Sequence, residues 1–208
     1  MPERLDPRRF DVADLGSKDA YKLLTSAVVP RPIAWVSTVS SAGVPNLAPY
    51  SFFNAVAGDP LTVMFAPSGK GDGSPKDSLK NAQDTGEFVV NLADEPLAEA
   101  LNHTSGAFAH GVSEFAEAGL EAAPSSLVRA PRVAAAPVAL ECRVSQLVPV
   151  AGSSAVMVLG QVVTLHVRNE LLGDDGLIVA ERLRPVARLG RDEYAALGRV
   201  FRLGRPKV

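Results

Sequence analysis

One short turn in this sequence combines the features of an anion-binding site. Ser74-Pro75-Lys76-Asp77 is typical of a helix start, with Ser74 as N-cap, Pro75 at the first helical position and Asp77 completing a capping box. The exposed backbone N–H groups of such a turn attract anions, and Lys76 and the Ser78 hydroxyl lie in the same turn. The turn could therefore bind a phosphate group, although a capping box can also be purely structural.

The loop before this turn, from Gly69 to Gly73, lies between an expected strand and the helix, as a nucleotide-binding loop does. It does not match the G-x-G-x-x-G pattern, because Ser74 stands where the third glycine belongs. The strands around it are also expected to be antiparallel, whereas that pattern belongs to a parallel βαβ unit. The loop gives little support to a Rossmann site.

A second candidate is the segment from Asn46 to Asn54, where polar side chains stand among aromatic residues and a proline. Tyr50, Ser51 and Asn54 occupy positions where a plain core strand would carry valine or isoleucine. Such a mixture can pack a flat aromatic ring and direct donors and acceptors at its polar edge. The structural alternative is a strand with a buried polar network, and the segment alone does not decide between the two.

Motifs for several other chemistries are missing from the sequence. It has no His-Glu-x-x-His and no G-x-S-x-G, and with one cysteine it can form neither an intrachain disulfide nor a multi-cysteine metal cluster. We therefore expect no metal site and no catalytic triad. Cys142 shares a strand face with Leu140 and Val144, which predicts a buried, inert thiol, whereas His166 is predicted to face solvent.

The composition is ordinary for a folded soluble protein, with 208 residues of which 47% are hydrophobic and 21% charged. A net charge of −2 argues against a general nucleic-acid binder. No apolar stretch is long enough for a membrane span, and the sequence favours a cytoplasmic protein. The chain is basic from Arg182 onward, a surface that is either solvated or meets a phosphate-bearing ligand or an acidic partner subunit.

Hydrophobic alternation and turn residues predict a mainly β chain. We expect strands over 33–40, 46–54, 61–66, 87–92, 139–150, 155–167 and 186–189, and helices over 17–26, 75–84, 96–102 and 113–118. The first three strands should form an antiparallel meander, and the two long strands a hairpin. The prediction is an N-terminal arm and short helix over 1–26, followed over 27–208 by a Greek-key β-barrel with a few helices.

Several blocks of the sequence, taken in order, resemble the flavin reductase-like family. They are Arg31–Thr38, Gly43–Asn54, Lys76-Asp77-Ser78, Gly111–Phe115 with Ala118–Leu120, and Arg188–Gly190 with Tyr194. The family's Lys-Asp-Thr turn has serine here, and the glycine-rich loop before it is longer than in the family. The resemblance implies an FMN-binding split barrel, an antiparallel six-stranded barrel seen in flavoredoxin and in flavin reductase components of two-component monooxygenases.

The same resemblance implies where FMN would lie. Lys76 and Ser78 would bind the phosphate. Ser37 and Thr38, in the strand over 33–40, would add polar contacts with FMN. Arg31 would either add charge at the phosphate or anchor Pro32. The ring would lie against the segment that ends at Asn54. The implied cofactor-binding residues are Arg31, Ser37, Thr38, Ala48, Pro49, Tyr50, Ser51, Phe53, Asn54, Lys76, Asp77 and Ser78.

The implied activity is NAD(P)H-dependent reduction of FMN, which would supply reduced flavin to a partner such as a monooxygenase. The flavin itself carries the hydride chemistry, so no catalytic side chain is expected. His110 either contacts the nicotinamide nucleotide or is a surface loop residue, and family members suggest a homodimer. Two alternatives stay open: a non-catalytic FMN-binding electron carrier, and a flavin-free split-barrel protein that binds another ligand. The sequence does not distinguish NADH from NADPH.

Overall fold

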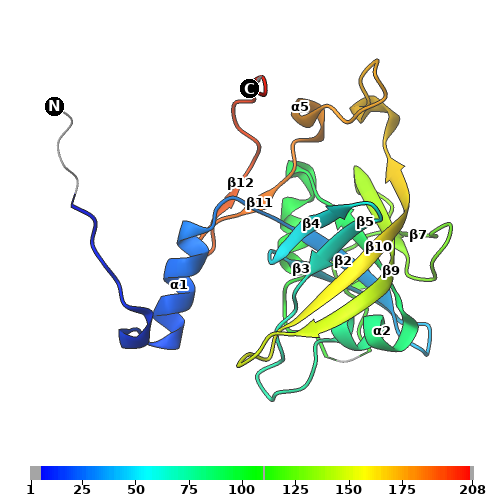
Figure 1. Cartoon of the computed structure of the whole chain (residues 1–208). Coiled ribbons are helices and arrows are strands. Elements are labelled where there is room, and N and C mark those ends of the chain that lie inside the picture. The colour runs from blue at the N-terminus through cyan, green and yellow to red at the C-terminus, as the bar shows by residue number, and fades with distance from the viewer. Residues whose placement is uncertain (1–5, 110, 207–208) are drawn as a thin grey trace.

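A computed structural model describes residues 6–109 and 111–206 (Figure 1). Its centre is an antiparallel sheet of seven strands in the order β3-β2-β6-β9-β10-β5-β4. The strands are β2 (Ala34–Val39), β3 (Pro45–Tyr50), β4 (Phe53–Gly58), β5 (Leu61–Phe65), β6 (Glu87–Leu92), β9 (Val138–Pro149) and β10 (Val156–Val167). The mainly β, antiparallel architecture is confirmed, as is the long hairpin of β9 and β10.

The segment predicted as one strand over 46–54 forms two strands instead. β3 ends at Tyr50 and pairs with β2, whereas β4 begins at Phe53 and pairs with β5 at the other end of the sheet order. Ser51 and Phe52 form a bend between them, so two residues join the two end strands of the sheet. The predicted meander is therefore wrong, and the split gives the sheet seven strands where six were expected.

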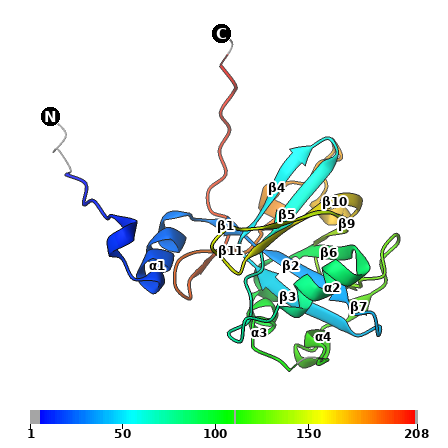
Figure 2. The same cartoon turned by 60° about the horizontal axis from the view of Figure 1, so that its bottom comes forward.

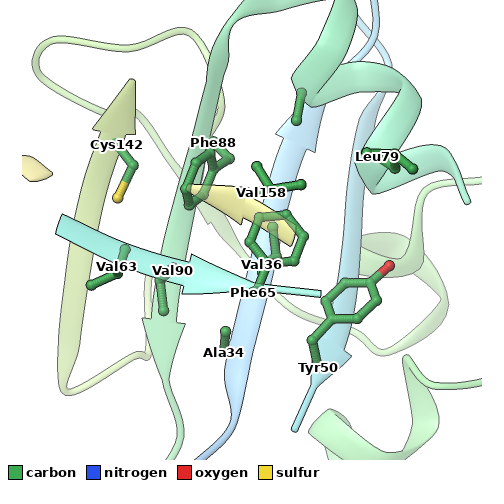
Figure 3. Close-up of a cluster of buried hydrophobic side chains, with 11 residues drawn as sticks. Ala34, Val36, Tyr50, Val63, Phe65, Leu79, Phe88, Val90, Cys142 and Val158 are labelled. Atoms are coloured by element: carbon green, nitrogen blue, oxygen red, sulfur yellow. The ribbon is translucent and has the colours of Figure 1, made fainter. Parts of the chain in front are cut away.

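The curved sheet encloses the main hydrophobic core (Figure 3). The buried ring of Phe65 lies between those of Tyr50 and Phe88, with ring centroids 5.2 and 5.1 Å away. Cys142 is fully buried in the same core, and burial raises the pKa of its thiol. The predicted buried and unreactive cysteine is confirmed.

The outer face of β2 is covered as well, so that all six residues of this strand are buried. Trp35 packs with Leu101 and Phe115, which come from the short helices α3 (Ala98–His103) and α4 (Glu114–Glu117). Its indole N–H donates a hydrogen bond of 2.8 Å to Thr104 Oγ1. The predicted helices over 96–102 and 113–118 correspond to these elements, with the 3-10 turn η2 (Glu95–Leu97) before α3 and the short strands β7 (Ala122–Ala123) and β8 (Arg132–Val133) after α4.

Helix α2 (Asp77–Thr85) packs against β2, β3 and β6. It begins two residues after the predicted start, because Ser74 donates its hydroxyl and its N–H to the carboxylate of Asp72 rather than capping the helix. Lys76 is the N-cap residue, and no side chain caps this end. The helix ends as predicted at Gly86, whose φ of 71° lies in the left-handed region.

Helix α1 (Ser17–Ala27) stands to one side of the barrel, after the 3-10 turn η1 (Val12–Asp14) (Figures 1 and 2). Its N-cap is Gly16, one residue before the predicted cap. Next to it lies a small sheet of β1 (Arg31–Pro32), β11 (Ala187–Arg188) and β12 (Tyr194–Ala195). Gly190 in the β11–β12 turn approaches α1 so closely that a Cβ there would lie 2.5 Å from Ser26 Oγ.

His166 on β10 is only partly exposed, with 26% of its side chain accessible, so the predicted solvent-facing position is correct only in part. Its Nε2 lies 2.6 Å from Oε1 of Glu141, a fully buried carboxylate that also accepts hydrogen bonds from the N–H groups of Ser126 and Leu127. Burial opposes the ionisation of Glu141, but these hydrogen bonds outweigh it and lower its pKa. Beyond β10, the 3-10 turn η3 (Asn169–Leu171) and α5 (Ala180–Leu183) lead back to β11. Among the described residues, no helix has the length and apolar character needed to cross a membrane.

Gly160 on β10 provides a test of how tightly this core is packed. A Cβ at this position would lie 2.3 Å from Cζ of Phe88 and 3.1 Å from Cβ of Cys142. We expect Gly160→Ala to lower the free energy of unfolding by about 1–3 kcal/mol, the usual cost of overpacking, measured by denaturant titration. Gly58→Ala is the matched control, because a Cβ at Gly58 meets open space. Equal stability of the two variants would contradict this packing.

Candidate functional site

A pocket of ≈ 400 Å³ lies between β3, the start of α2 and the loop that follows α3; we refer to it as the β3–α2 pocket. Its volume is within the range of small-molecule sites. The lining residues are Asn46, Ala48, Pro49, Tyr50, Gly69, Lys70, Gly71, Lys76, Asp77, Ser78, Thr104, Ser105, Gly106, Ala107, Phe108 and Glu114.

A buried polar network forms the base of this pocket. With its amide oxygen toward Ser78, Asn46 accepts a hydrogen bond from Ser78 Oγ at 2.9 Å and donates one to Glu114 Oε1 at 3.3 Å; the opposite orientation would set two acceptors against each other. Ser78 Oγ accepts a hydrogen bond of 3.1 Å from the Tyr50 hydroxyl, and Glu114 Oε2 accepts one of 2.8 Å from the Leu47 N–H. The network joins β3, α2 and α4.

Burial shifts the ionisation of two members of this network. It raises the pKa of Tyr50 far above its ordinary value, so the phenol remains a neutral donor at any physiological pH. Burial also raises the pKa of Glu114, and the charge of Asp77 adds to the effect. The Tyr50 phenol at the base of the pocket is therefore neutral, and the Glu114 carboxyl takes up a proton more readily than an ordinary glutamate does.

Positive charge gathers at the mouth of the pocket, at the start of α2. Lys76 is exposed, its Nζ lies 5.8 Å from the centroid of the Tyr50 ring, and no carboxylate of the described residues forms an ion pair with it. Lys70 Nζ lies 3.1 Å from Asp77 Oδ1 and offsets that acid. A cation at the positive end of an uncapped helix is locally unfavourable. Such a conflict is typical of a site for a negatively charged ligand.

The structure brings one group of the expected site residues together in this pocket. Ala48, Pro49 and Tyr50 come from β3, and Lys76, Asp77 and Ser78 come from the start of α2. The side chain of Ser78 is turned into the buried network, with the residue only 1% exposed, so its hydroxyl serves the base of the pocket. The anion-binding turn predicted at Ser74–Ser78 lies at the pocket mouth, although the helix begins later than expected.

Ser37 and Thr38 do not line this pocket, because both are fully buried within β2. Ser37 Oγ donates to the Pro131 carbonyl, and Thr38 Oγ1 accepts a hydrogen bond of 3.0 Å from the amide of Asn81 on α2. These hydroxyls satisfy buried backbone and helix groups. The expected polar contacts of Ser37 and Thr38 with FMN stay a prediction.

Arg31 and Ser51 line a second pocket of ≈ 260 Å³, which we call the α1–β11 pocket. The guanidinium of Arg31 is buried and donates to the carbonyls of Thr25 (2.5 Å), Val28 (2.7 Å) and Leu189 (2.7 Å). Of the two expected roles of Arg31, the geometry favours the anchor, because three carbonyls take up most of its donors.

Phe53 and Asn54 line a third pocket, a largely apolar one of ≈ 520 Å³ shared with Ile33, Leu92 and Val186. They are separated from the β3–α2 pocket because the bend at Ser51–Phe52 sends β4 to the other end of the sheet order. His110 lies outside the described residues. No cluster of three or more potential metal ligands occurs in residues 6–109 and 111–206.

Sequence reasoning did not single out several pocket residues as ligand contacts, among them Asn46, Lys70, Phe108 and Glu114. Glu114 could have been found, because it stands in the block Gly111–Phe115 that carries part of the family resemblance. Asn46 opens the polar segment that the sequence did identify. The loop from Thr104 to Phe108 has no such signal, since only the tertiary fold brings it opposite β3.

Comparison with known proteins places these features in context. Residues 26–187 match the flavin reductase like domain. The structure of nitrilotriacetate monooxygenase component B from Bacillus cereus superimposes with a TM-score of 0.91 at 36% identity, covering 95% of this chain and 99% of that chain. For 2-nitrobenzoate 2-nitroreductase NbaA from Pseudomonas fluorescens the values are 0.87 and 32%, with 96% of each chain covered. A Shewanella frigidimarina protein with a split barrel domain superimposes with a TM-score of 0.84 at 20% identity, covering 94% of this chain and 96% of that chain, which confirms the split-barrel fold.

The network at the base of the pocket can be tested by a double-mutant cycle on Ser78 and Tyr50. We expect Ser78→Ala and Tyr50→Phe each to lower the free energy of unfolding by about 1–3 kcal/mol, because each leaves a buried polar partner unsatisfied. The double variant should cost less than the sum, with a coupling of about 0.5–1.5 kcal/mol in denaturant titrations. Strictly additive losses would mean that the two hydroxyls do not depend on each other.

Proposed function

The chain belongs to the flavin reductase-like family, and we propose that it binds FMN in the β3–α2 pocket and reduces it with NADH or NADPH. The uncapped start of α2 carries this proposal. It combines backbone N–H donors, an exposed lysine that forms no ion pair with any carboxylate in residues 6–109 and 111–206, and a pocket large enough for a small-molecule ring system. In this proposal the protein supplies reduced flavin to a partner enzyme.

The donor chemistry at the pocket mouth fits the phosphate of FMN. The N–H groups in the first turn of α2 would hold the dianion, and Lys76 would add a charge-assisted contact. Asp77, which stands in the same turn, is offset by Lys70 at 3.1 Å. Lys70 belongs to the glycine-rich loop, which is longer than expected for the family. Its charge would reduce the repulsion between Asp77 and a bound phosphate.

The walls of the pocket fit a flat ring with one polar edge. Ala48 and Pro49 on one side and Phe108 on the other offer apolar surface, and Asn46 and Glu114 offer polar groups at the base. Because the network of Tyr50 and Ser78 fixes these groups before any ligand arrives, ring binding would require little side-chain ordering.

When bound, the flavin supplies the hydride-accepting group, so the protein needs to provide position and a dry environment rather than an acid or base. The absence of a nucleophile–base pair in the sequence is consistent with this division of labour. Tyr50 would remain a neutral donor, and Tyr50 and Glu114 would keep the pocket base hydrogen-bonded. The loop from Thr104 to Phe108 would cover one face of the ring and exclude water.

The activity can be measured directly with purified protein. With added FMN we expect oxidation of NADH or NADPH, which is measured as the loss of nucleotide absorbance. No turnover with either nucleotide would remove the catalytic claim. FMN that copurifies and stays bound without nucleotide turnover would indicate an electron carrier, and a colourless protein without affinity for FMN would indicate another ligand.

Two further parts of the proposal concern assembly. The Bacillus cereus neighbour is named as a monooxygenase component and the Pseudomonas fluorescens neighbour as a nitroreductase. We propose a homodimer that passes reduced flavin to a monooxygenase. Sedimentation of the purified protein tests the dimer.

Nucleotide oxidation that requires 2-nitrobenzoate, and does not occur with FMN alone, would favour nitro-group reduction instead.

The role assigned to Lys76 predicts a difference between two flavins. Lys76→Ala should weaken FMN binding about tenfold, the value of one partly exposed charge-assisted contact, and leave riboflavin binding almost unchanged. Fluorescence titration measures both affinities. Lys80→Ala is the matched control, because Lys80 lies on the same helix but forms an ion pair with Asp84 away from the pocket. Equal weakening of FMN and riboflavin would show that Lys76 is structural.

A further inference from the structure

The α1–β11 pocket is a second cavity that the proposed FMN site does not use. It shares Pro49 and Ser105 with the β3–α2 pocket, so the two pockets adjoin each other. The start of α2 with Lys76 lines the β3–α2 pocket. Two arginines, Arg188 and Arg191, line the α1–β11 pocket.

These two arginines differ from the other cations of the pocket in their partners. Arg31 is buried against backbone carbonyls, and Lys22 lies 3.7 Å from Asp19. Arg188 and Arg191, in contrast, have no ion pair with any carboxylate in the described part of the chain. Their charges are the ones left for a ligand.

The surrounding structure holds the two arginines at fixed positions. The guanidinium of Arg188 stacks over the Tyr194 ring, 4.5 Å from its centroid, and donates a hydrogen bond to the Arg191 carbonyl. The Tyr194 hydroxyl in turn donates a 3.0 Å hydrogen bond to Asn102 Oδ1. Arg191 has φ = 54° in the β11–β12 turn, a conformation that α1 supports through its close contact with Gly190. The guanidinium of Arg188 is therefore preorganised, and the turn fixes the backbone from which the exposed side chain of Arg191 extends.

We propose that the α1–β11 pocket binds the adenosine diphosphate half of the nicotinamide nucleotide, with Arg188 and Arg191 on the diphosphate. This inference rests on the proposed function, which requires a second phosphate-bearing ligand beside FMN. Arginine forks suit phosphate oxygens, and the exposed ring of Tyr21 offers a face on which adenine can stack. Because the two pockets adjoin at Pro49 and Ser105, the nicotinamide end would be able to extend into the flavin pocket.

An alternative occupant of these arginines is the phosphate of FMN itself. The geometry favours the dinucleotide, because the start of α2 already offers an anion site in the β3–α2 pocket. Two adjoining pockets, each with its own cations, match two phosphate-bearing ligands better than one. The experiment below is designed so that the FMN alternative gives a different result.

The test is calorimetric titration of the full-length protein with ADP, both with and without FMN. The variants are Arg188→Gln and Arg191→Asn, the latter because asparagine tolerates a positive φ. Each should weaken ADP binding about tenfold, the loss of one partly exposed charge-assisted hydrogen bond, with FMN affinity unchanged. Arg199→Gln is the matched control, since Arg199 lies in the exposed C-terminal segment and does not line the pocket. Adenosine lacks phosphates, so its binding affinity should be the same for the wild type and all three variants.

The possible outcomes separate this inference from the proposed function. ADP affinity that is unchanged in both arginine variants, or equally reduced in the control, would overturn it. A loss of FMN affinity in place of ADP affinity would assign the arginines to the FMN phosphate and overturn it as well. A third outcome is that the arginine variants lose ADP affinity while the wild type oxidises neither nucleotide. That outcome would support the ADP-binding site and refute the proposed reductase activity.

Discussion

The requirement that buried polar groups find partners holds the candidate site together. Asn46, Tyr50, Ser78 and Glu114 come from three elements, and each is at most 7% exposed. Each would be costly to bury alone. Their mutual hydrogen bonds fix the start of α2 against β3, and this single docking creates both the pocket and the exposed helix end at its mouth.

A second buried group extends this arrangement beyond the barrel. Arg31 sits between the end of α1, the β11–β12 turn and the bend after β3, and binds a carbonyl or hydroxyl in each. The α1–β11 pocket therefore has walls from three separated stretches of chain, and these are held by one guanidinium. The family resemblance alone could not separate this anchoring role from a ligand contact. Only the positions of Thr25, Val28 and Leu189 make the distinction.

Local signals in the sequence predicted the strands, the helices and the anion-binding turn, because alternation, glycine and proline act over a few residues. The failures have a common cause in tertiary structure. The sequence around Ser51–Phe52 resembles one continuous strand. Only the pairing of β4 with β5, at the other end of the sheet order from β3, shows that the chain bends there. The hydroxyl partners of Ser37 and Thr38 could not be predicted either, because they depend on β2 being covered on both faces, which brings Pro131 and Asn81 against it. The loop opposite β3 carries no signal in the sequence at all.

The central claim is that the start of α2 receives the phosphate of a flavin whose ring lies along β3. A crystal structure of the protein with FMN tests this claim most directly. It should show phosphate oxygens within hydrogen-bond distance of Lys76 Nζ and of backbone N–H groups in the first turn of α2, with the ring against Ala48 and Pro49. A phosphate bound at Arg188 and Arg191, or a ring in the apolar pocket beside Phe53, would contradict the account.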